Sequence, residues 1–162
     1  MVKIRKTQEK DRNEIHSILI NTGYFTPLEI QTAMELVDIF LSNKNRPDYH
    51  LYTAINNQNH VAGYICFGQI PLTEGTYDIY WIAVSPEYQG KGIGTSLLKK
   101  AEKKIIEMHG YLICIETSSS STYKSTQSFY KRRGYILESR IRDFYRPGDD
   151  RLLFIKYFNS FH

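Results

Sequence analysis

The amino-acid sequence predicts an α+β fold: a mixed, mostly antiparallel sheet of about seven strands with about four helices packed on it. Three observations support this prediction. The length of 162 residues corresponds to about one domain, and the apolar and charged fractions, 41% and 23%, are typical of a globular chain. No linker or repeat divides residues 1–162. Strand-like and helix-like patterns follow one another in the order β-α-α-β-β-β-α-β-α-β-β.

The first elements are a short strand at residues 3–6 and a helix at 11–20 with apolar side chains at helical spacing. A second helix begins at Thr26, a good N-cap residue. Pro27 suits the first helical position, and Glu29 completes a capping box. The sequence therefore predicts two helices after the first strand.

Residues 51–56 and 61–69 are strand-like and flank a polar turn, so they predict a hairpin. Residues 76–84 are rich in aromatic and β-branched side chains and form the most strand-like segment of the chain. We expect three consecutive antiparallel strands here.

After Gly90 the apolar period changes to that of a helix, which ends at His109–Gly110, and a strand follows at 111–117. A helix at about 122–133 ends at Gly134. Strands at 135–142 and 152–158 flank a turn at residues 146–150 that contains Pro147–Gly148. A parallel crossover is expected between the fourth and fifth strands.

Cys66 and Cys114 lie in apolar runs, which favours buried, reduced thiols over a disulfide or a metal site. The first ten residues lack the apolar region of a secretory signal, and no apolar run approaches the roughly 20 residues of a membrane span. These features predict a cytoplasmic protein without a metal. The net charge of +4 is too modest to favour nucleic acid as a partner.

The stretch 81–95 passes from a strand through a glycine-rich turn into a helix. Gly90, Gly92 and Gly94 remove side chains where the backbone N–H groups of a helix start can surround an anion. The same glycines also fit a tight turn without a ligand. The Walker A and Rossmann patterns are both absent, because neither spacing is met.

Gln89-Gly90-Lys91-Gly92-Ile93-Gly94 resembles the Q/R-x-x-G-x-G/A signature of the GNAT superfamily of N-acetyltransferases. Phe129-Tyr130 with Gly134-Tyr135 is similar to the FY-x-x-x-GF segment of that family. The resemblance implies a GNAT-like fold over the whole chain and binding of acetyl-coenzyme A.

By this resemblance the pyrophosphate binds the amides of the glycine turn, and the pantetheine arm pairs with the strand before it, where that strand splays from residues 111–117. By their positive charge, Lys91 and the group at 131–133 are candidates to meet the 3′-phosphate. The predicted coenzyme-binding residues are Ile82, Ala83, Val84, Gln89, Gly90, Lys91, Gly92, Ile93, Gly94 and Thr95. Many relatives carry Asn where this chain has Tyr123, so Ser125 or Thr126 is a candidate replacement for that coenzyme contact.

Acetyl transfer from a thioester to an amine needs a proton acceptor for the amine and a proton for the leaving thiolate, but no covalent nucleophile. The resemblance implies Tyr130 as the general acid. For the general base, Asp78, Glu116 or a water molecule remain open. Strict strand alternation places Asp78, Tyr80 and Ile82 on one face of the sheet, and Ile79 and Trp81 on the other.

The acceptor site is predicted between the turn after the first helix, with Tyr24 and Phe25, and the final hairpin, with Tyr145. Asp149 and Asp150 in that hairpin are candidates to attract a cationic amine. The prediction is an acetyl-coenzyme A dependent N-acetyltransferase that acts on a primary amine of a small molecule or peptide by direct transfer in a ternary complex. The alternative is a non-catalytic acetyl-coenzyme A sensor. The aromatic ending at 157–162 either extends a strand into a partner, which would give a homodimer, or covers the core.

Overall fold

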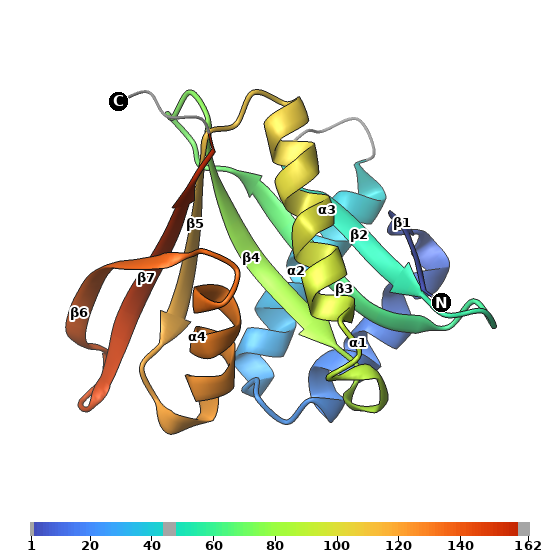
Figure 1. Cartoon of the computed structure of the whole chain (residues 1–162). Helices are drawn as coiled ribbons and strands as arrows, with labels where there is room; N and C mark the ends of the chain where they lie inside the picture. The colour runs from blue at the N-terminus through green and yellow to red at the C-terminus, as the bar shows by residue number, and fades with distance from the viewer. Residues whose placement is uncertain (1, 44–47, 159–162) are drawn as a thin grey trace.

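The computed structural model describes residues 2–43 and 48–158. In this part of the chain, seven strands form one sheet in the order β1-β2-β3-β4-β5-β7-β6 (Figure 1). The strands are β1 (Lys3–Lys6), β2 (His50–Ile55), β3 (Val61–Gln69), β4 (Thr76–Val84), β5 (Leu112–Ser118), β6 (Ile136–Arg146) and β7 (Asp149–Tyr157). The helices are α1 (Arg12–Asn21), α2 (Pro27–Ser42), α3 (Ile93–Glu107) and α4 (Lys124–Lys131), with 3₁₀ turns η1 (Glu9–Asp11), η2 (Pro86–Tyr88) and η3 (Ser121–Tyr123). The predicted element order and the α+β class are confirmed.

The sheet separates two hydrophobic clusters. Helices α1 and α2 cover one face, where Ile15, Val37 and Tyr64 are fully buried. Helix α3 covers the other face through Leu97 and Ile105, and Tyr130 of α4 joins that cluster (Figure 1). Each helix therefore buries one apolar stripe against the sheet, as its periodicity predicts.

Strand β4 is parallel to β5 over only three residue pairs, from Thr76 with Leu112 to Asp78 with Cys114. Beyond this point β4 stays paired with β3, whereas β5 stays paired with β7 along its whole length. The two central strands therefore diverge toward their carboxyl ends, as Figure 1 shows. This confirms the expected parallel crossover and the splay of these strands.

The predicted alternation along β4 is wrong after residue 79. The register shifts so that Cys66 lies opposite Trp81 and Phe67 lies opposite Ile79, which leaves Tyr80 as the extra residue of a β-bulge. Tyr80 and Trp81 consequently both pack against the cluster beneath α1 and α2. Ile82 packs with Ile79 against the opposite cluster.

The final hairpin also differs from the prediction. Strand β6 is longer than expected, and all its residues are exposed. Asp149 and Asp150 belong to β7 and not to a turn, and Gly148 alone adopts a positive φ, 81°, at the reversal.

Tyr157 is exposed and Phe158 packs on the core, whereas the rest of the aromatic ending lies outside the described residues. Among the described helices, none is long and apolar enough to cross a membrane.

The capping box at the start of α2 is present as predicted. Thr26 Oγ1 accepts a hydrogen bond from the Glu29 amide at 3.2 Å, and Glu29 Oε2 accepts one from the Thr26 amide at 2.6 Å. These bonds satisfy two backbone donors that the helix itself leaves without acceptors, and they fix the turn between α1 and α2.

We predict that Thr26→Ala lowers the free energy of unfolding by about 1 kcal/mol, because it removes the hydroxyl that caps α2. Urea unfolding followed by circular dichroism measures this change. Thr32→Ala is the matched control, since Thr32 lies on the exposed surface of the same helix and bonds only to the Leu28 carbonyl. Equal effects of the two substitutions would contradict the capping role.

Candidate functional site

The glycine turn before α3 presents unpaired backbone donors. Gly90 and Gly92 have φ values of 73° and 78°, in the left-handed region that favours glycine. The first hydrogen bond of α3 runs from the Ser96 amide to the Gly92 carbonyl at 3.0 Å. The amides of residues 93–95 therefore precede the helical ladder, and no side chain caps them. This end of α3 has the geometry and partial positive charge of an anion site.

The end of β4 carries backbone groups that the sheet does not use. The Ser85 amide bonds to the Ala62 carbonyl of β3, and the Ala83 carbonyl also lies against β3, beside Gly63. Alternation along an antiparallel strand then directs the backbone groups of Ile82 and Val84 away from β3, toward the space that β5 has left. Gln89 Nε2 donates to the Val84 carbonyl at 3.1 Å and ties the glycine turn to the strand.

Arg133 is the cation that the fold brings to the start of α3. Its Nε donates to Thr95 Oγ1 at 3.0 Å, its Nη2 bonds to the same hydroxyl, and its guanidinium lies 4.0 Å from the centre of the Phe129 ring. Arg133 is the member of the 131–133 group that approaches the glycine turn. Lys91, the other candidate, lies over the ring of Tyr88 at 5.2 Å.

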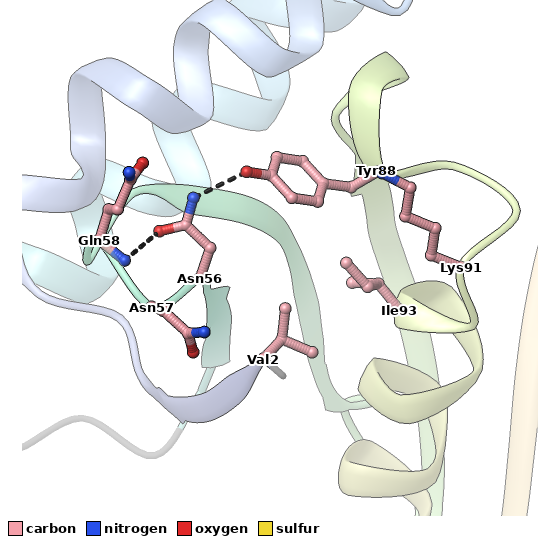
Figure 2. Close-up of a pocket in the computed structure, with 7 residues that line it drawn as sticks. All are labelled: Val2, Asn56, Asn57, Gln58, Tyr88, Lys91 and Ile93. Carbon is pink, nitrogen blue, oxygen red and sulfur yellow. Dashed lines mark hydrogen bonds between the residues drawn. The ribbon is translucent and has the colours of Figure 1, made fainter.

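A hollow of about 450 Å³ lies between the loop that precedes α3 and the turn that joins β2 to β3 (Figure 2). In Figure 2, Tyr88 and Lys91 face Val2 and the turn between β2 and β3 across this hollow. Asn56 Nδ2 donates to the Tyr88 hydroxyl at 2.7 Å. This contact tethers the glycine turn to the neighbouring hairpin and so restricts its position.

Tyr130 is buried beside the point where β4 and β5 diverge. Its ring lies 5.9 Å from that of Tyr135 and 6.2 Å from that of Phe154, and the side chain is 4% exposed. Burial raises the pKa of Tyr130 above its ordinary value, and the negative charge of Asp78 raises it further. The hydroxyl therefore keeps its proton at neutral pH.

Asp78 occupies the last β4–β5 pair, beside Cys114. Burial raises the pKa of Asp78 to about 6, the neighbouring charge of Glu116 adds to the rise, and Arg151 opposes it. A carboxylate with this pKa is mainly ionised at neutral pH and is still basic enough to accept a proton.

Glu116 lies on the same face of the sheet as Asp78, but both of its oxygens are occupied. Tyr145 donates to Oε1 at 2.9 Å, and Arg151 Nε lies 2.7 Å from Oε2. The Arg151 guanidinium also lies 5.4 Å from the centre of the Phe144 ring. Glu116 therefore holds two side chains of the hairpin in place, which leaves Asp78 as the better candidate for the base.

Asp149 and Asp150 are 7% and 4% exposed and serve the hairpin itself. Asp149 accepts a hydrogen bond from Ser118 Oγ and pairs with Arg146 at 3.5 Å. Asp150 pairs with Arg140 and accepts from the Asp143 amide at 2.9 Å. Their charges are balanced within the protein, so the structure does not support the prediction that they attract the acceptor amine.

The turn between α1 and α2 lies against the same region through aromatic contacts. The Phe25 ring meets Trp81 at 5.4 Å between centroids, and the Tyr123 hydroxyl donates to the Tyr24 carbonyl at 3.3 Å. Burial raises the pKa of Tyr123 to about 12, and the charges of Glu29 and Asp149 contribute to the rise. Tyr123 therefore lies between the two predicted acceptor segments, and its hydroxyl is directed to the first of them.

The two thiols are poor nucleophiles. Cys66 is fully buried and Cys114 is half-buried, and both are free. Burial raises the pKa of both thiols, and the charge of Asp78 adds to the effect. They stay protonated at neutral pH, in keeping with a reaction that needs no covalent intermediate.

Sequence reasoning missed Arg151 and Trp81 and did not single out Arg133 from its neighbours. Arg151 meets Glu116 because β7 is inserted between β5 and β6, which places residue 151 opposite Ser118. Trp81 turns toward Phe25 because of the β-bulge. The hint of Arg151 in the sequence is that β7 begins with three charged residues before its apolar run.

A family model described as the acetyltransferase (GNAT) family matches residues 4–135. A crystal structure assigned to that family, from Desulfovibrio desulfuricans, shares 37% identity, covers 97% of this chain and 99% of its own, and superposes with a TM-score of 0.93. The chain therefore belongs to the GNAT acetyltransferase family, and its fold is the GNAT fold.

Two further comparisons are more distant. The PaiA N-acetyltransferase of Thermoplasma acidophilum, solved with coenzyme A, has a TM-score of 0.76 at 18% identity and covers 98% of this chain and 99% of its own. N-alpha-acetyltransferase 30 of Xenopus laevis is 35% identical over 74 residues, or 46% of this chain. The match spans only 26% of that relative.

We predict that the Asp78 carboxyl titrates with a midpoint near pH 6, and that Arg151→Gln raises this midpoint because a nearby positive charge is lost. Glu116→Gln lowers it, because a like charge is lost. Carboxyl ¹³C NMR of Asp-labelled protein measures the midpoints, with Asp78→Asn for assignment. Asp38 is the internal control, since its bond with Arg12 lowers its pKa below 3.8. An Asp78 midpoint below 4 would exclude the proposed environment.

Proposed function

We propose that this protein transfers the acetyl group of acetyl-coenzyme A directly to a primary amine of a small molecule or peptide. One observation carries the proposal: the divergence of β4 from β5 lies between an uncapped helix start and the pair Asp78 and Tyr130. This arrangement supplies an anion site, an extended edge for an amide-bearing arm, and two proton-transfer groups that are near enough to interact electrostatically.

The coenzyme is expected to lie along the gap between β4 and β5. Its pyrophosphate meets the amides of residues 93–95 and the glycine turn, with Arg133 beside it as the counter-charge. The pantetheine amides pair with the outward backbone groups of Ile82 and Val84, whereas those of Ala83 are directed to β3. The Thermoplasma relative was solved with coenzyme A, which supports coenzyme A as the class of ligand.

In the reaction the amine nitrogen forms a bond to the thioester carbon, and the carbon–sulfur bond breaks. Asp78 accepts the proton that the amine loses, directly or through a water molecule, and Tyr130 donates a proton to the departing thiolate. Each group has the protonation state that its role needs at neutral pH. Burial raises both pKa values, but that of Asp78 stays at about 6, below neutral pH, and that of Tyr130 lies above its ordinary value of 10.

A cytoplasmic location, a single domain over residues 1–162 and a homodimer are additional proposals that rest on the sequence alone. A coenzyme-binding sensor without turnover is the competing function. Binding of acetyl-coenzyme A is expected of both functions, and turnover separates the transferase from the sensor.

The first experiment tests the coenzyme site by thermal unfolding. Acetyl-coenzyme A at about 100 times its dissociation constant should stabilise the protein by roughly 2.7 kcal/mol. ATP and NAD serve as controls and should give a smaller shift, because neither carries the pantetheine arm. Gly92→Ala should weaken the acetyl-coenzyme A shift, since its φ of 78° strains any other residue. Equal shifts with all three ligands would exclude a specific coenzyme site.

The second experiment tests the chemistry. We expect kcat/KM to rise with pH through about 6, as Asp78 ionises, and we expect Asp78→Asn to lose this limb together with about 100-fold or more of the rate. Tyr130→Phe should lower kcat and leave acetyl-coenzyme A binding in place. A sensor would bind the coenzyme and show no turnover in any form. An unchanged kcat in Tyr130→Phe would remove the assignment of the acid.

A further inference from the structure

Arg151 is held in a definite position on the face of the sheet that carries Asp78. Adjacent residues define this face: Ile113 and Ile115 of β5 and Leu152 of β7 point into the opposite cluster. Glu116 and Arg151 therefore point the same way as Asp78, whose neighbours Tyr77 and Ile79 are also in that cluster. One face of the sheet thus presents two carboxylates and one guanidinium.

The contacts of Arg151 use only part of its guanidinium. Its Nε faces Glu116 Oε2 at 2.7 Å, and the Phe144 ring lies 5.4 Å from its central carbon. Within residues 2–43 and 48–158 no hydrogen bond from its Nη1 or Nη2 is present, and the buried Nε also has no hydrogen-bond partner, so its contact with Glu116 is an ion pair only. The side chain is 25% exposed, so these donors are within reach of a small molecule.

The Glu116 carboxylate is itself oriented by Tyr145, which donates to its other oxygen at 2.9 Å. The contacts of Glu116 with Tyr145 and Arg151 therefore orient the guanidinium and leave its Nη1 and Nη2 without a hydrogen-bond acceptor among the described residues. A guanidinium with a free pair of N–H donors matches the two oxygens of a carboxylate or of a similar anionic group.

We propose that the acceptor amine carries an anionic oxygen group, as an amino acid does, and that Arg151 binds this group while the amine reaches Asp78. The inference rests on the proposed acetyl transfer. Asp78 lies opposite Cys114, and Cys114 is two residues from Glu116 along β5, or about 7 Å. With a hydrogen bond of about 3 Å at each end, a small α- or β-amino acid bridges a separation of this order, whereas the amino terminus of a peptide has no carboxylate next to its amine.

The experiment compares each of the 20 common amino acids with its own carboxamide as acceptor, at saturating acetyl-coenzyme A, by release of coenzyme A thiol. For at least one amino acid we expect kcat/KM to exceed that of the carboxamide by about 10- to 100-fold, the range expected of a charge-assisted hydrogen-bonded pair. The matched compounds differ only in the charge and oxygen count of the group that Arg151 would bind.

Arg151→Gln should bring the ratio of acid to carboxamide kcat/KM close to one, and Arg151→Lys should keep only part of it, because an ammonium lacks the planar pair of donors. Arg142→Gln removes the same charge from the same hairpin and should leave the ratio unchanged. Thermal unfolding and the acetyl-coenzyme A dissociation constant show whether each variant is folded.

Three outcomes would overturn the inference: a wild-type ratio near one, a ratio that persists in Arg151→Gln, or turnover of other amines with none of any amino acid. All three leave the proposed function intact, since the protein still binds acetyl-coenzyme A and acetylates an amine. Failure to bind the coenzyme, or to acetylate any amine, would instead remove the proposed function and the inference with it.

Discussion

The divergence of β4 and β5 after the pair Asp78 and Cys114 is the constraint on which the rest of the site depends. Each strand keeps its other neighbour, so the gap costs no pairing elsewhere in the sheet. It leaves the backbone groups of Ile82 and the amide of Val84 unpaired with another strand in the described part of the chain and open to an extended ligand, whereas the Val84 carbonyl already accepts a hydrogen bond from Gln89. Helix α4 is anchored beside the gap by Gln127, whose Nε2 donates to the Ser118 carbonyl at 3.0 Å, and this contact positions Tyr130.

Two carboxylates on one face of the sheet have different environments and therefore different roles. Asp78 is largely desolvated, which raises its pKa to about 6 and suits it to proton transfer. Glu116 has hydrogen-bond and ion-pair partners on both oxygens and orients Tyr145 and Arg151 instead. The assignment of base and positioning residue thus follows from contacts, not from residue type.

The β6–β7 hairpin connects structural and functional features. Asp149 and Asp150 are satisfied by Ser118, Arg146, Arg140 and the Asp143 amide, which stabilises the hairpin against the end of β5. Their burial fixes the neighbouring residue Arg151 beside Glu116. Asp149 and Asp150, which the sequence suggests as substrate-binding residues, therefore hold in place Arg151, the residue that we propose binds the substrate.

The order of elements, the capping box at Thr26 and the glycine turn were all determined by the sequence, because each depends on residues close together in the chain. The family motifs likewise located Tyr130 and the coenzyme turn from local pattern alone. Only the tertiary structure decided which carboxylate is free, where Trp81 points and what Arg151 contacts. Those outcomes depend on a bulge in β4 and on the insertion of β7 between β5 and β6, which are pairings between residues distant in sequence that no local periodicity records.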